Sequence, residues 1–180
     1  MSIDESRLKV PLTPTRDTSV RNLMDRQQWH AEVFAQDNGF EPYIHFTDEL
    51  DDFQFTALDA AIENILVVRG IDLVSTEWLK PLGQGLHEFR VRHTEDEILH
   101  MFGAGEIGAS TKKKVLLRVF VHFHGERVVL LLSGYDKGDD PSDRRQEKAI
   151  AKARQYLTEW RSQETLRKAA SRKSPRQTPK

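Results

Sequence analysis

Alternating apolar and polar positions predict that the second half of this chain is rich in β-strands. In 115–123 every odd position is apolar, and a similar two-residue period runs through 86–93 and 127–135. These segments contain many β-branched and aromatic residues, and residues 124–126 form a tight turn between the last two. Residues 29–35 alternate in the same way and are followed by Asp-Asn-Gly, which is typical of a turn. We therefore expect four strands.

A helical period separates the first strand from the other three. Apolar residues recur at positions 55, 58, 62, 65 and 66, and Gly70 follows as a stop signal. Thr47 is an N-cap or early-helix residue for the acidic segment 48–52. A shorter helix is expected over 72–78. These features predict two helices between the first and second strands.

A long charged helix is expected to end the domain. It begins at Pro141 or Ser142 and runs to about Gln163, and its apolar stripe consists of Ile150, Ala153, Tyr156, Leu157 and Trp160. The element order β-α-α-β-β-β-α predicts an α+β fold with one antiparallel sheet and helices packed mainly on one face.

The chain is expected to form one domain over 28–163, with a flexible extension at 1–27 and a basic disordered tail at 164–180. A long polar connection, 94–114, joins two of the strands. Residues 1–111 hold nine Lys/Arg and 20 Asp/Glu, whereas residues 112–180 hold 18 and eight. This asymmetry is compatible with a polyanion-binding half, or with a polar surface that carries a basic tail.

Composition narrows the range of functions. The chain has no cysteine, which excludes disulfides, thiol nucleophiles and Cys-based zinc sites, and makes a reducing cytoplasm the expected location. No apolar run approaches the roughly 18 residues that a membrane helix needs. We therefore expect no membrane association.

Strand alternation places several cations on one sheet face. If Phe89 and Val91 point toward the core, then the opposite face carries Glu88, Arg90, Arg92, Arg118, Phe120, His122 and His124. Glu88 is then placed to pair with an arginine and hold it in position. The alternative is that these are ordinary charges on a solvated face. His122 and His124 have a spacing that suits metal ligands, but no third ligand has a matching spacing, so no metal site is expected.

Four segments in order resemble the phage-derived, HigB-like branch of the RelE toxin superfamily. They are WHAEVF at 29–34 with DNG at 37–39, KPL at 80–82 with GLHEFR at 85–90, LRVF at 117–120, and VVLLL at 128–132 with GYDK at 134–137 and Pro141. The similarity covers about 28–163. It implies a RelE-like fold and the toxin component of a type II toxin–antitoxin system. Such toxins are mRNA-cleaving endoribonucleases that act commonly on the ribosome and inhibit translation.

The resemblance implies catalytic roles for Arg90, Arg118 and Lys137, which match family positions. Tyr135 stands where the family usually has Phe. Two features depart from the family pattern, because Gly138 replaces a second lysine and residues 94–114 form a longer insertion. The resemblance also implies a cognate antitoxin, a DNA-binding helix-turn-helix protein.

The expected reaction is metal-free attack of a ribose 2′-hydroxyl on the adjacent phosphate, without a cofactor. Arg90 and Arg118 are candidates to stabilise the charge on the phosphorane, and Lys137 to share this role or donate a proton. His122 or Tyr135 is the candidate base, with His122 favoured by its intrinsic pKa.

The candidate RNA-binding residues are Arg92, Lys112, Lys113, Lys114 and, by stacking with bases, Phe120 or Tyr135. Two alternatives remain at this point: a catalytically weakened RelE-fold protein that binds RNA, the ribosome or a partner without cleavage, and a gyrase-directed, ParE-like toxin.

Overall fold

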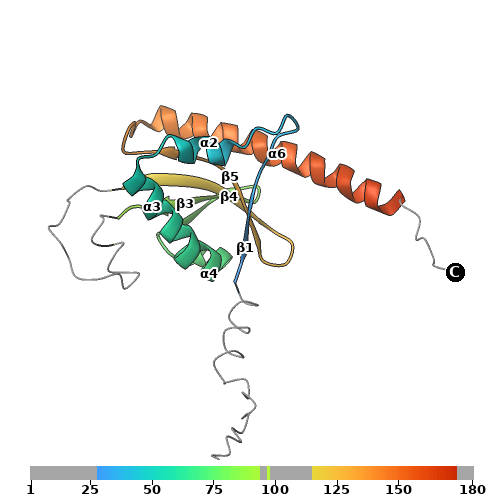
Figure 1. Ribbon diagram of the computed structural model, residues 1–180, viewed down its shortest axis with the longest axis horizontal. Helices are drawn as coiled ribbons and strands as arrows, with labels where there is room; N and C mark the ends of the chain where they lie inside the picture. The colour runs from blue at the N-terminus through green and yellow to red at the C-terminus, as the bar shows by residue number, and fades with distance from the viewer. Residues whose placement is uncertain (1–27, 94–96, 98–114, 174–180) are drawn as a thin grey trace, which may run out of the picture.

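A computed structural model describes residues 28–93, 97 and 115–173. In it a five-stranded sheet lies between a long C-terminal helix and a group of shorter helices (Figure 1). This arrangement is an α+β fold, as the sequence predicted. The predicted extension 1–27 and nearly all of the connection 94–114 lie outside the described residues. No helix in the described part of the chain is long and apolar enough to cross a membrane.

The sheet is mixed, so the prediction of a purely antiparallel sheet is wrong. Its strands are β1 (His30–Val33), β2 (Leu79–Gly83), β3 (Leu86–Val91), β4 (Leu117–His124) and β5 (Val128–Asp136), in the spatial order β1-β5-β4-β3-β2. β1 pairs in parallel with β5, and the other pairs are antiparallel. No hairpin turn links β1 to β5, so long-range packing sets their relative direction. β2 was not predicted.

The helices between β1 and β2 begin earlier than expected. α2 (Pro42–Asp48) precedes α3 (Asp52–Ala61), and Thr47 lies inside α2 instead of capping the next helix. Asp51 is the actual cap, since its side chain accepts from the Gln54 backbone N–H while the Gln54 side chain accepts from the Asp51 N–H. The chain continues as a π-helical turn η1 (Ile62–Leu66) and α4 (Val67–Arg69).

Gly70 ends this helical segment, as predicted. Its φ of 52° lies in the left-handed region, and a Cβ at this position would clash with the Trp29 ring. Glycine is therefore required both by the backbone and by the packing. A 3₁₀ turn, η2 (Gly70–Ser75), takes the place of the helix expected over 72–78.

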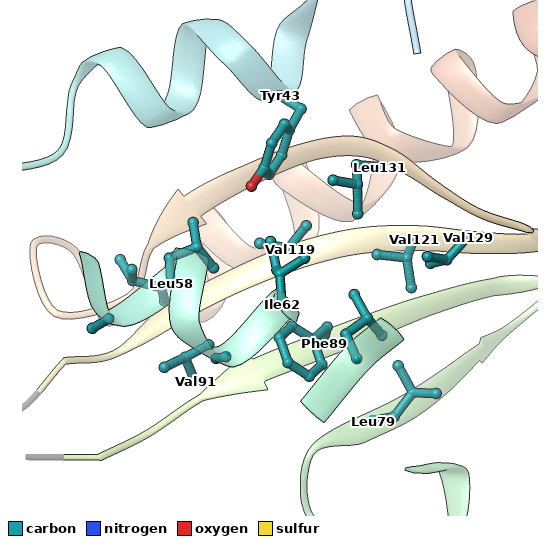
Figure 2. Packing of buried hydrophobic residues seen from close by; sticks show 14 of the residues in the cluster. Tyr43, Leu58, Ile62, Leu79, Phe89, Val91, Val119, Val121, Val129 and Leu131 are labelled. Carbon is teal, nitrogen blue, oxygen red and sulfur yellow. The ribbon is translucent and has the colours of Figure 1, made fainter. Parts of the chain in front are cut away.

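The larger core fills the space between α3, its neighbouring helices and one sheet face (Figure 2). Leu58 and Ile62 from the helices meet Phe89, Val119 and Val121 from the sheet. Val115, Leu117, Val119 and Val121 all belong to this core, and Phe123 packs against it, as the alternation predicted. Together with Tyr43 and Phe46 of α2, these contacts fix one face of the sheet.

The opposite face is covered by α6 (Asp143–Lys173), so the prediction that helices pack mainly on one face is wrong. Figure 1 shows α6 on one side of the sheet and α3 and α4 on the other. A second core contains the predicted apolar stripe of α6 together with Phe34, Leu86, Phe120, Leu130, Leu132 and Tyr135. α6 also continues to Lys173, whereas the sequence predicted a disordered tail from residue 164.

Candidate active site

Strand register places three of the predicted catalytic residues side by side. Arg90 of β3 pairs with Arg118 of β4, and Arg118 pairs with Tyr135 of β5. A bulge in the β4–β5 ladder shifts the alternation in β5, so that Tyr135 and Leu132 both belong to the α6-facing core. The N-terminal part of α6 covers this end of the sheet.

A buried carboxylate holds the two arginines together. Glu88 is completely buried; its Oε1 accepts from Arg90 Nε at 2.7 Å and lies 3.4 Å from Arg118 Nε. Arg118 is 6% exposed and also donates through Nη1 to its neighbour's carbonyl, Leu117 O, at 2.9 Å. The side chain of Arg90 is 21% exposed. A buried charge of this kind requires paired partners, and here the pairing orients both guanidinium groups. The expected pairing of Glu88 with an arginine is confirmed.

A glutamine of α6 connects Lys137 to the same carboxylate. Gln146 Nε2 donates to Glu88 Oε2 at 3.3 Å, and Gln146 Oε1 accepts from Lys137 Nζ at 3.1 Å. Lys137 follows directly after β5, so the end of that strand and the first turns of α6 together fix its position. Gln146 was not identified from the sequence.

Arg90, Arg118, Tyr135 and Lys137 gather around Glu88 and are called the cationic cluster below. Burial changes the pKa of two of its residues. Burial, and secondarily the charge of Glu88, raises the pKa of Tyr135 to about 12, so the phenol is protonated at neutral pH. Its hydroxyl is buried and makes no hydrogen bond to any described residue. Burial lowers the pKa of Arg118, and Glu88 opposes that shift. A guanidinium nevertheless stays charged in proteins.

A cavity of about 410 Å³ opens beside Tyr135 at the C-terminal end of β5. Its lining includes Gln54, Asp136, Asp139 and Arg145. Gln54 donates to Asp136 Oδ2 at 2.6 Å, which ties α3 to the end of β5. Arg145 was not identified from the sequence. The signal for it is its position in the first turn of a helix, where a positive charge is unfavourable because it opposes the helix dipole.

The structure separates His122 from this cluster. His122 lies four residues from Arg118 along β4, or about 13 Å at the usual rise of a strand. Its Nδ1 lies 2.7 Å from Gly85 O, and its ring packs on Trp160 of α6. Burial lowers the pKa of His122 from its ordinary value. We therefore do not retain His122 as the base.

Most of the predicted RNA-binding residues also lie outside the cluster. Phe120 is completely buried and stacks on Tyr135 at a centroid distance of 5.9 Å, so it is not available to stack on bases. Arg92 forms a surface ion pair with Glu77 at 2.8 Å. Lys112, Lys113 and Lys114 lie outside the described residues. Within the described ranges, no group of three or more His, Asp or Glu side chains could hold a metal ion.

Comparisons with family models, with curated proteins and with solved structures found no match to this chain. The chemistry of the site is therefore inferred from its own side chains. Three cationic groups, on Arg90, Arg118 and Lys137, are connected to one carboxylate, that of Glu88. The cluster thus keeps an excess of positive charge, which suits an anionic group such as a phosphate.

Proposed function

We propose that the protein is a metal-independent endoribonuclease of the RelE-like, HigB-like type, the toxin of a type II toxin–antitoxin system that cleaves mRNA on the ribosome. The observation that carries the proposal is the pairing of Arg90 with Arg118 on adjacent strands, both held by the buried Glu88. Preorganised guanidinium groups stabilise charge without reorganisation during the reaction, and this is usually the largest catalytic contribution.

In the proposed reaction the ribose 2′-oxygen bonds to the adjacent phosphorus, and the bond from phosphorus to the 5′-oxygen breaks. Water takes the 2′-hydroxyl proton, and Lys137 gives a proton to the departing 5′-oxygen. Arg90, the more exposed arginine, binds the phosphorane oxygens, and the charge of the buried Arg118 beside it adds to their stabilisation. Tyr135 keeps its proton at neutral pH and its hydroxyl is buried, so we do not retain this second of the two candidate bases.

The proposed setting is a cytoplasmic complex with a cognate helix-turn-helix antitoxin. This part of the proposal rests on the four-segment resemblance of the sequence to HigB-like toxins. An antitoxin would relieve toxicity by covering the cationic cluster, since complementary charge favours such a contact.

A cleavage assay with defined products tests the proposal. Purified protein is incubated with mRNA in two arms, one without ribosomes in the presence of EDTA and one with ribosomes in a buffer that contains Mg²⁺. The expected products carry 2′,3′-cyclic phosphate and 5′-hydroxyl ends, because the attacking oxygen belongs to the RNA itself. Two results would contradict this mechanism: 5′-phosphate ends in either arm, or ribosome-free cleavage that occurs with Mg²⁺ and is abolished by EDTA.

A second candidate function is RNA or partner binding without cleavage. The burial of Arg118 and Tyr135 favours it, as does Gly138 at the position of the family's second lysine. This candidate predicts that RNA associates with the protein, with or without ribosomes, and stays intact. The same assay separates the two functions when bound and cleaved RNA are both measured.

A further inference from the structure

The last turns of α6 extend beyond the sheet and carry exposed cations. The helix has 31 residues and is therefore about 46 Å long. Gln163 is the last residue for which a hydrogen bond to the body of the domain is described, to Ala35 O at 3.2 Å and Asp37 Oδ1 at 2.8 Å. In Figure 1 the C-terminal end of α6 projects away from the other elements.

Helical geometry arranges the cations of this region in one stripe. Arg154, Arg161, Lys168 and Arg172 are separated by seven, seven and four residues, which places all four within about 40° around the helix. Between Arg154 and Arg172 no acidic residue lies within this 40° sector; Glu159 lies on another side of the helix, and Glu164 borders the stripe and pairs with Arg167. We call these four residues the basic stripe.

The two halves of the basic stripe have different surroundings. Arg154 donates to Leu82 O at 2.7 Å and Arg161 to Gln84 O at 2.7 Å, so both fix α6 on the β2–β3 turn. Lys168 and Arg172 are exposed and make no hydrogen bond or ion pair within the described part of the chain. The first pair anchors the helix and leaves the second pair free for a ligand.

We propose that the basic stripe of α6 binds the phosphate backbone of a nucleic acid. Binding to phosphates requires positive charge and needs no apolar contact. Protein interfaces instead depend on buried apolar or aromatic anchors. Beyond Trp160 this helix offers one large apolar side chain, Leu166, with two alanines. The helix is therefore better suited to a phosphate backbone than to a protein partner.

This inference goes beyond the proposed function, because binding by the stripe requires no cleavage. A labelled 2′-O-methyl RNA tests it directly, since RNA of this kind has no free 2′-hydroxyl and cannot be cut by the proposed reaction. Binding is measured by fluorescence anisotropy at several salt concentrations. The test variant is Lys168→Gln/Arg172→Gln, which keeps good helix formers at both positions.

The matched control is Arg69→Gln/Lys148→Gln, which removes the same amount of charge from exposed positions outside the stripe. We expect the test variant to bind more weakly and the slope of log K against log salt to become shallower by about 1 to 2. The control is expected to keep the wild-type slope. Circular dichroism checks that both variants keep their helix content.

Three results would overturn the proposal. The first is an unchanged slope of log K against log salt in the test variant, and the second is an equal change of this slope in the control variant. The third is that the test variant loses binding to poly-glutamate as strongly as binding to RNA, which would indicate a general preference for acidic polymers. Failure of RNA cleavage by the wild-type protein would not affect this test.

Discussion

At the residue scale, Glu88 determines how the cationic cluster is built. Its carboxylate is completely buried and contacts both Arg90 and Arg118, while Gln146 binds its second oxygen. Breaking a buried pair leaves a desolvated charge without compensation, which costs much more than losing a surface pair. Glu88 therefore stabilises the fold as well as positioning the two arginines.

Glu88→Ala is expected to lower the free energy of unfolding by about 3 to 5 kcal/mol, because Arg118 would remain buried without its counter-charge. Glu77→Ala is the matched control, since Glu77 pairs with Arg92 at the surface and its loss should cost at most about 1 kcal/mol. Urea denaturation measures both values. Equal costs for the two variants would show that the buried pair has no special role.

The raised pKa of Tyr135 predicts that the protein loses stability at high pH. Its pKa is raised from 10.0 to about 12 in the folded protein, so below pH 10 both states hold the proton. Above pH 10 the unfolded chain releases this proton first, and stability falls until the folded state also ionises.

We expect Tyr135→Phe to lose less stability than the wild type between pH 10 and 12. At pH 7 the substitution should cost little, because it removes a buried hydroxyl that makes no hydrogen bond to the described residues. Thermal denaturation over this pH range measures the difference. Parallel curves for the two proteins would contradict the assigned shift.

At the element scale, the sequence predicted what local alternation determines and missed what long-range packing determines. The faces of β4 follow from the two-residue period alone, and the structure confirms them. The mixture of Arg118, Phe120 and His122 on the second face suggested an open surface, but α6 covers it. β2 was missed because Pro81 and Gly83 are rare inside strands.

The sequence predicted only part of the candidate active site, because local alternation determines some of its positions and long-range packing determines the others. Arg90, Arg118 and Tyr135 come together because they occupy paired positions on neighbouring strands. Two features of the site depend on how α6 lies over the sheet: the contact of His122 with Trp160, and the positions of Gln146 and Arg145 beside the cluster. The periodicity of the sequence does not predict how α6 packs on the sheet.

Packing of α6 on the sheet gives a third prediction. Leu157 is 2% exposed in the second core, whereas Leu166 on the same helix is 71% exposed. Leu157→Ala should cost about 2 to 5 kcal/mol of unfolding free energy, and Leu166→Ala should stay within about 0.5 kcal/mol. Urea denaturation of both variants tests whether α6 is an integral part of the fold. A small cost at Leu157 would mean that the helix is only loosely attached.

At the scale of the whole molecule, α6 contributes residues to two cationic regions at its opposite ends. Its first turns supply Gln146 to the cluster around Glu88, and its last turns carry the free half of the basic stripe. The helix thus connects a proposed cleavage site with a proposed binding surface for the phosphate backbone. The two proposals concern different ends of one element and can be tested separately.

In the proposed reaction, Arg90 and Arg118 stabilise the charge that develops during RNA cleavage. Arg90→Ala tests it best, because the partly exposed Arg90 can be removed while Arg118 stays paired with Glu88. Arg69→Ala is the control, since it removes an exposed arginine from α4 on the other side of the sheet. Thermal denaturation verifies that both variants are folded.

The decisive measurement is the single-turnover rate of RNA cleavage by these two variants and the wild type. Loss of one stabilising donor should slow Arg90→Ala by about 10²- to 10³-fold, while Arg69→Ala keeps the wild-type rate. Cleavage at the wild-type rate by folded Arg90→Ala would show that Arg90 does not stabilise this charge.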